Sequence, residues 1–241
     1  MRLKTSMQCI QACATTCRFI ARQRGAALIV SLLMLTVVLM LGISAAHIAL
    51  QGEKASRNDR DRQIAMQAAE AALIDAESDI EHSPRSHLFN SDRTDGFTES
   101  CGSGQPNIYL GLCSQAEHAD IPVWQRVDFM NTDGQAHAVT YGHFTGHVIQ
   151  TGPGLLPALP PRYIIERISY SSADPATDTE NPTYFYRITA VGFGMRDITQ
   201  VALQTFYRKK DGGKEQTILP AGRFGWREIS NWQELHNAFG K

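Results

Sequence analysis

The feature that most constrains the fold of this chain is an apolar stretch, residues 26–50, that contains no Asp, Glu, Lys or Arg. At about 1.5 Å per residue, a helix of this length crosses the roughly 30 Å hydrocarbon layer of a bilayer. We therefore expect residues 26–50 to form a single transmembrane helix.

Charge is distributed unevenly about this stretch. Residues 1–25 hold five of the 23 basic residues and none of the 24 acidic residues, so the rest of the chain has a net charge of −6. Because basic segments beside an apolar span stay in the cytoplasm, we expect the chain after residue 50 to be exported. The acidic remainder argues against nucleic acid, so no such partner is expected.

The start of the chain does not follow the pattern of an ordinary secretory signal. Such a signal has its cleavage site after the apolar core, and no small-residue site closes residues 26–50 cleanly. Instead, a basic leader ends at Gly25 and passes directly into the apolar segment. The leader therefore needs a different explanation.

The helical pattern continues beyond the apolar stretch. From Glu53 to Ser83 the chain has no Gly or Pro, and Pro84 is expected to end the helix. Polar residues such as Asp61 and Asp75 are expected on its exposed faces. We predict one helix over residues 26–83, amphipathic in its second part. Its apolar positions recur at helical spacing: Ala65, Ala69, Ala72, Leu73, Ala76 and Ile80.

Beyond Pro84 the sequence is typical of strands and turns. The clearest strands are residues 162–170, 183–193 and 199–209, which are rich in β-branched and aromatic side chains. The last two are separated by a five-residue loop that predicts an antiparallel hairpin. Residues 121–129 and 138–150 are weaker strand candidates.

The expected fold is therefore α+β and has a long N-terminal helix packed on a C-terminal antiparallel sheet. The predicted divisions are a leader (1–25), the helix (26–83), a strand-rich head (84–210) and a C-terminal extension (211–241). Trp226 and Trp232 are expected to hold this extension in place.

Three of the five cysteines lie in the leader, and two lie in the part of the chain that we expect to be exported. Cys101 and Cys113 alone lie in the exported part, and an even pair in an oxidising compartment suggests a disulfide. Its loop closure would be worth about 3 kcal/mol. Cys9, Cys13 and Cys17 lie in the leader without zinc or ferredoxin spacing, so we interpret them as chance placements.

The sequence offers little catalytic chemistry. His137, His143 and His147 form its only histidine cluster, and intervening glycines argue against the helix that would make them metal ligands. The acidic stretch 171–182 lacks the spacing of an EF-hand and is expected to be a solvated loop. No nucleophile elbow, phosphate loop or dinucleotide fingerprint is present. We expect no catalytic residue, metal or cofactor, and no enzyme activity.

A basic leader ending in glycine, an apolar span that continues as an amphipathic helix, and a strand-rich head together resemble the prepilins. Within that class the chain resembles the PilX-type minor pilins of type IV pilus assembly. The resemblance covers almost the whole chain after the leader. It depends on RQRGAALIVSLLMLTVVLMLG (22–42), DRQIAMQAAEAALIDAE (61–77), PRYIIERIS (161–169), YRITAVGFG (186–194) with QVALQTFYR (200–208), and GRFGWREI (222–229).

The resemblance implies a processing site and a route. A prepilin peptidase would cleave between Gly25 and Ala26 and methylate the new amine of Ala26. The protein would first span the inner membrane once with a periplasmic head, and would then enter an extracellular pilus. Filament packing is implied for five apolar residues: Leu28, Ile29, Val30, Leu32 and Leu33.

One departure from the major pilins is informative. Major pilins carry a glutamate at the fifth mature position, where this chain has Val30. The departure suggests a subunit at or near the pilus tip that helps to start assembly with other minor pilins. The implied partners are those minor pilins, the major pilin and a large tip adhesin.

Two alternatives remain open at this stage. A tip pseudopilin of a type II secretion system also lacks that glutamate, but it usually carries a large inserted helical domain with calcium sites, for which this chain is short. A periplasmic protein with a single membrane anchor would keep its leader. The mass of the mature chain separates this second alternative from a pilin.

Overall fold

The computed structural model describes residues 26–90, 95–103, 107–115, 121–170, 183–210 and 220–239. The chain divides into two compact units, Met1–Ser56 and Arg57–Lys241. The two units are described separately.

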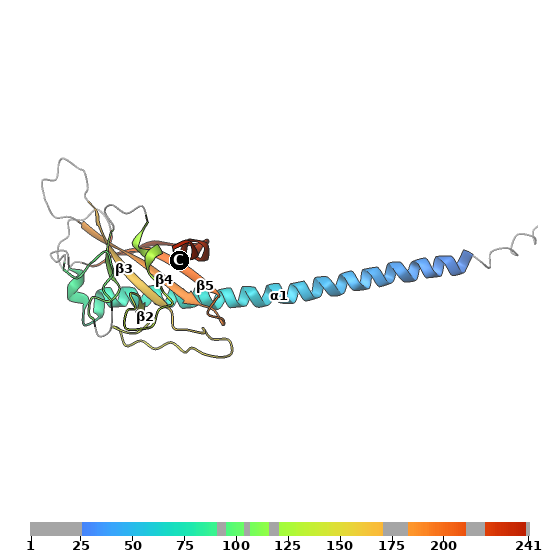
Figure 1. Cartoon of the computed structure of the whole chain (residues 1–241), viewed down its shortest axis with the longest axis horizontal. Helices are drawn as coiled ribbons and strands as arrows, with labels where there is room; N and C mark the ends of the chain where they lie inside the picture. Colours follow the sequence, from blue (N-terminus) through green and yellow to red (C-terminus); the bar gives the residue numbers. More distant parts are fainter. Residues whose placement is uncertain are drawn as a thin grey trace, which may run out of the picture. The chain divides into compact units, whose positions relative to one another are not determined.

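The longest element is α1 (Ala26–His82), shown in Figure 1. It is long and apolar enough to cross a membrane. The helix ends two residues before Pro84, which lacks an amide hydrogen and cannot continue it. The predicted long N-terminal helix is confirmed.

Six strands of the described chain form one sheet in the second unit, in the order β1-β3-β4-β5-β6, and β2 also pairs with β3. Strands β3 to β6 are antiparallel, which confirms the β4–β5 hairpin, whereas β1 is parallel to β3. The sheet is therefore mixed and not wholly antiparallel as predicted. The strands are β1 (Leu112–Ser114), β2 (Val139–Thr140), β3 (Arg162–Tyr170), β4 (Thr183–Phe193), β5 (Gln200–Arg208) and β6 (Gly222–Glu228).

Both weaker strand predictions need correction. Residues 121–129 contain the short helix α2 (Val123–Arg126), because Pro122 precedes a turn that buries Val123 and Trp124. Within 138–150 only β2 is a strand. Gly142 and Gly146 there adopt positive φ angles of 77°, which ordinary strand geometry excludes.

Two further elements lie in the stretch that we expected to be a C-terminal extension. β6 pairs with β5, and α3 (Trp232–Phe239) follows it, so the sheet continues past residue 210. Trp232 is buried, whereas Trp226 remains 49% exposed. The remaining short helix of the head is η1 (Ser86–Phe89).

The two faces of the sheet bury different cores. On one face, α1 packs its alanine stripe and Ile80 against residues that include Tyr163, Ile188 and Leu203. On the other face, Trp124, Phe129 and Trp232 pack with residues that include Ile164, Val191 and Phe193. Alternate residues of β3, β4 and β5 thus enter opposite cores, as the two-residue period of a strand requires.

Small residues bring α1 and β4 together. A Cβ atom at Gly192 would lie 2.1 Å from the carbonyl oxygen of Ala65 and 2.3 Å from the amide nitrogen of Ala69. No side chain fits at those distances. The alanine stripe of α1 and Gly192 therefore set how closely the helix approaches the sheet.

Candidate assembly site

The apolar segment of the first unit presents aliphatic side chains outward. The five residues expected to pack in a filament lie here, each between 57% and 68% exposed: Leu28, Ile29, Val30, Leu32 and Leu33. At 3.6 residues per turn these five side chains cover a little over half of the helix circumference, and Met34 and Leu35, each 60% exposed, extend the apolar surface over most of the rest. A helix that is apolar all round needs lipid or other apolar helices as its surroundings.

The hydroxyl groups of this segment are satisfied within the helix. Ser31 and Thr36 donate to the carbonyl oxygens of Leu28 and Leu33, at 2.9 and 2.8 Å, and Ser44 donates to that of Met40 at 2.8 Å. Such bonds to the preceding turn remove the cost of placing a hydroxyl among hydrocarbon. The segment can therefore exchange one apolar environment for another.

Val30 is the fifth residue of α1, and the first carboxylate along this helix is Glu53. The apolar segment therefore has no anionic side chain of its own. α1 begins at Ala26, whereas Gly25 lies outside the described residues. Cleavage between Gly25 and Ala26 and methylation of Ala26 remain predictions.

In the second unit, the α1 side chain of Asp61 binds the turn between β4 and β5. It accepts hydrogen bonds from the amide of Met195 at 2.5 Å, from Thr199 Oγ1 at 2.6 Å and from Arg196 Nε at 3.3 Å. Burial alone would raise the pKa of Asp61, but these donors outweigh it and hold the pKa below its ordinary value. Asp61 is therefore a buried anion that fixes the turn on the helix.

Asp75 fixes a second loop in the same way. Its carboxylate accepts a 2.7 Å bond from the amide of Gly142 and a bond from Thr145, and His147 Nδ1 lies 2.8 Å away. Asp75 is fully buried. It holds the first residues of the loop between β2 and β3 against α1.

Asp79 is the third buried aspartate of α1. It binds Arg85 through three contacts of 2.5 to 3.2 Å and accepts a 2.8 Å bond from the Tyr163 hydroxyl. Arg85, itself buried, donates to the carbonyl oxygens of Ile108 and Leu110 at 2.9 and 2.6 Å. Burial and the neighbouring Asp79 raise the pKa of Tyr163 well above its ordinary value, so the tyrosine stays a donor.

These aspartates correct a sequence expectation. Asp61 and Asp75 were expected on exposed faces, yet both lie on the buried face with Asp79. Their separations of 14 and 4 residues are close to whole numbers of helical turns, as are those of the alanine stripe. This shared spacing could have predicted, from the sequence, that the three aspartates lie on the same buried face of α1 as the alanines.

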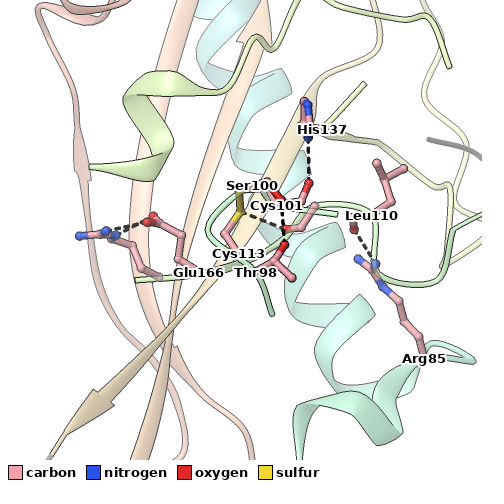
Figure 2. The surroundings of a disulfide bond; sticks show 10 residues. Arg85, Thr98, Ser100, Cys101, Leu110, Cys113, His137 and Glu166 are labelled. Carbon is pink, nitrogen blue, oxygen red and sulfur yellow. Dashed lines mark hydrogen bonds and ion pairs between the residues drawn. A yellow bond between two sulfur atoms is a disulfide. The ribbon is translucent and has the colours of Figure 1, made fainter. Parts of the chain in front are cut away.

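Cys101 and Cys113 form a disulfide. Both are fully buried, and the amides of Cys101 and Ser114 each donate to the carbonyl of Thr98, at 3.0 and 2.9 Å. Figure 2 shows His137 directed at the Cys101 carbonyl, 3.0 Å away. The disulfide thus attaches the loop around Thr98 to β1 and so to the sheet.

The structure separates the predicted histidine cluster. His137 lies at Cys101 and His147 at Asp75, while His143 packs edge-on against Phe144. Within the described ranges, no group of three or more His, Cys, Asp or Glu could hold a metal ion. The leader cysteines Cys9, Cys13 and Cys17 and the whole acidic stretch 171–182 lie outside those ranges.

A long helix, apolar in its first part and packed on a strand-rich head in its second, defines a pilin-like architecture. Two family models match the chain, PilX N-terminal at residues 24–73 and Type IV pilus assembly protein PilX C-term at residues 109–209. Together they span more than half of the sequence. The chain belongs to the PilX family of type IV pilus assembly proteins. No curated protein and no solved structure matched it.

Membership of this family gives the chain the role of a minor pilin in a type IV pilus. The family is structural, and its members act by interaction with other pilus components. The apolar first part of α1 fits a membrane anchor for such a protein.

Proposed function

We propose that this minor pilin occupies the tip of the pilus or a position next to it, and that it helps to start assembly with other minor pilins. Val30, at the fifth position of the mature chain, is the observation that supports this proposal. Major pilins have a glutamate there, which is thought to pair with the terminal amine of a neighbouring subunit.

The pairing matters because the filament core is apolar. A buried amine without a partner either loses several kcal/mol of solvation or gives up its proton. A subunit without the glutamate cannot neutralise the amine of the subunit above it. It can still offer its own amine, at Ala26, to the glutamate of the next subunit added below.

This asymmetry favours the first position in a fibre. Only the first subunit has no neighbour above whose amine needs a partner, so only there does the missing carboxylate cost nothing. We place the other minor pilins and the major pilin below it as partners, and a large adhesin above it as a further candidate.

The proposal includes the processing route. The peptidase removes residues 1–25 on the cytoplasmic side and methylates Ala26, and the inner-membrane form has its head in the periplasm. Because cleavage precedes the apolar segment, the mature protein keeps its anchor. The same segment then leaves the lipid and packs among other pilin helices through Leu28, Ile29, Val30, Leu32 and Leu33.

Val30→Glu tests the tip position. The variant regains the carboxylate that an internal subunit needs, so we expect immunogold labelling to spread from the fibre ends along the shaft. Labelling of the unmodified protein should stay at the ends. A variant still confined to the ends, or an unmodified protein found along the shaft, would contradict the proposal.

Two control variants distinguish ion pairing with the terminal amine from the general effect of a polar side chain in the apolar segment. Val30→Gln places a similar but uncharged side chain at the same position, and Val38→Glu places a carboxylate two turns further along the exposed apolar segment. Neither should bind the amine, so both should label the fibre ends alone. Spreading of either control would remove the electrostatic explanation.

A further inference from the structure

The described residues cover only part of the sheet face opposite α1. Around Ile164, Val191 and Phe193, the residues Trp124 and Trp232 close a compact core. The strand positions that follow on this face, toward the ends of β3 and β5, carry a different set of side chains. We call this area the arginine–phenylalanine face, and its residues are Arg126, Glu166, Phe185, Arg187, Gln204, Phe206, Phe224 and Arg227.

Strand register places these residues together. Glu166 is opposite Arg187, which is opposite Phe206, and Gln204 in the next row is opposite Arg227. The rings of Phe185 and Phe224 meet edge to face with centroids 5.5 Å apart. Phe206 and Phe224 stay 42% and 39% exposed. Four neighbouring strands thus present one surface with aromatic side chains open to solvent.

The charges on this face are mostly positive. Glu166 is fully buried and binds Arg187 through two contacts, at 2.8 and 2.7 Å; Figure 2 shows this carboxylate with its guanidinium partner. Burial raises the pKa of the Glu166 carboxyl, and the positive charges of Arg187 and Arg126 oppose that rise. Arg227 binds the Gln204 side chain at 2.8 and 3.2 Å. Arg187 therefore pairs with the one carboxylate of this face, and Arg126 and Arg227 add further positive charge to it.

The polar contacts hold the face in one arrangement. Gln204 donates to Thr189 at 3.0 Å while it accepts from Arg227, so the guanidinium of Arg227 is oriented by a buried amide. Arg126 and Arg227 remain exposed. Preformed guanidinium groups beside exposed rings bind carboxylates and apolar side chains at a low entropy cost.

We propose that the arginine–phenylalanine face docks an acidic polypeptide segment of a partner protein, whose carboxylates pair with Arg126 and Arg227 and whose apolar side chains cover Phe206 and Phe224. Excess positive charge selects an acidic partner. A polypeptide fits better than a nucleic acid because the two exposed arginines would make few phosphate contacts and the chain after residue 25 has a net charge of −6. This inference goes beyond the tip position and does not depend on it.

The test uses the full chain in detergent and a fluorescent random copolymer of glutamate and tyrosine as the acidic probe. We expect Arg126→Ala with Arg227→Ala to weaken binding about tenfold in fluorescence anisotropy, as the loss of two exposed charge pairs implies. Phe206→Ala should weaken it by a similar factor at high salt, where the charge pairs are screened. Arg57→Ala with Arg60→Ala, two exposed arginines of α1, is the matched control and should change nothing.

Several outcomes would overturn the proposal. Equal weakening by the control pair would show a general charge effect. Tighter binding of a dT oligonucleotide than of the copolymer, with the same dependence on Arg227, would assign the face to nucleic acid. Tighter copolymer binding after neutralising Asp174, Asp178 and Glu180 would show that the chain occupies the face itself. The variants alter exposed side chains, and matching thermal unfolding curves will confirm that they fold.

Discussion

At the scale of single residues, this protein depends on the absence of side chains as much as on their presence. Gly192 and the alanines at 65 and 69 let α1 approach β4 more closely than any larger residue would permit. Burial of the alanine stripe then removes apolar surface from water without requiring large side chains. The close approach of the two backbones therefore depends on small residues in both α1 and β4.

Gly192→Ala tests this contact. The added methyl group would overlap the backbone of α1 at 2.1 and 2.3 Å, so we expect a loss of about 3 kcal/mol in the free energy of unfolding. Denaturant titration of the full chain, followed by tryptophan fluorescence, measures it, since all three tryptophans lie in the head. Gly134→Ala is the control, because nothing lies within 4 Å of its Cβ position. Similar midpoints for both variants would refute the packing argument.

The buried carboxylate of Asp61 stabilises the fold because hydrogen-bond donors surround it. The group has a folded pKa below its ordinary value, so its contribution to stability is present above the unfolded pKa of about 4 and is lost as the pH falls through the folded pKa. Removing the charge should therefore matter at neutral pH and matter little in acid.

Asp61→Asn should lower the free energy of unfolding at pH 7 by about 2 kcal/mol, and the difference from the unmodified protein should shrink as the pH falls below about 4. Unfolding curves across this pH range provide the measurement. Asp59→Asn, an exposed carboxylate of the same helix, serves as the reference and should leave the curves unchanged. A difference between Asp61→Asn and the unmodified protein that stays constant with pH would exclude the charged interaction as its cause.

At the scale of elements, α1 is the common support of the head. Asp61, Asp75 and Asp79 each attach a different part of the chain to it, and Glu81 accepts a 2.9 Å bond from Tyr207 at the end of β5. The helix therefore positions turns and loops as well as burying the sheet. In the loop of residues 141–161, one carboxylate of α1 binds the first residues, and the amide of Ala158 donates to the carbonyl of Gly194 near the far end.

On the sheet face opposite α1, the disulfide attaches a loop to the head, as the aspartates do on the α1 side. It closes a loop whose ends are 12 residues apart, and both cysteines belong to the second core. We expect Cys101→Ser with Cys113→Ser to lower the free energy of unfolding by about 3 kcal/mol. The denaturation midpoint of the unmodified protein should fall to that of the variant when a thiol reductant is added, and the variant should not respond. An unmodified protein insensitive to reduction during unfolding would argue against this contribution.

At the scale of the whole molecule, the chain combines an apolar segment that needs lipid or other helices with a head that forms its own two cores. The first property fits a membrane anchor, and on the proposed route it also fits a fibre core. The second allows the head to fold without contacts from other subunits.

The processing route makes a prediction at this scale. Intact-mass measurement of protein from membranes or fibres should give a chain that begins at Ala26, lacks residues 1–25 and carries one added methyl group. Gly25→Leu, which replaces the small residue at the cleavage site, should leave the full-length chain and prevent its entry into fibres. Recovery of the unmodified protein from fibres with Met1 still in place would contradict both the route and the tip proposal.

The amino-acid sequence by itself determined the long helix, its end near Pro84, the strands at 162–170 and 183–193, and the hairpin that follows. These features depend on local periodicity and on residues that break helices, which act within a few positions of the chain. The tertiary structure decided the burial of Asp61, Asp75 and Asp79, the parallel strand β1 and the addition of β6 to the sheet. Asp61 bonds to Thr199, 138 residues away, and Asp75 to Gly142, 67 residues away. An aspartate is buried only when such distant donors reach it, and no local pattern records which donors will do so.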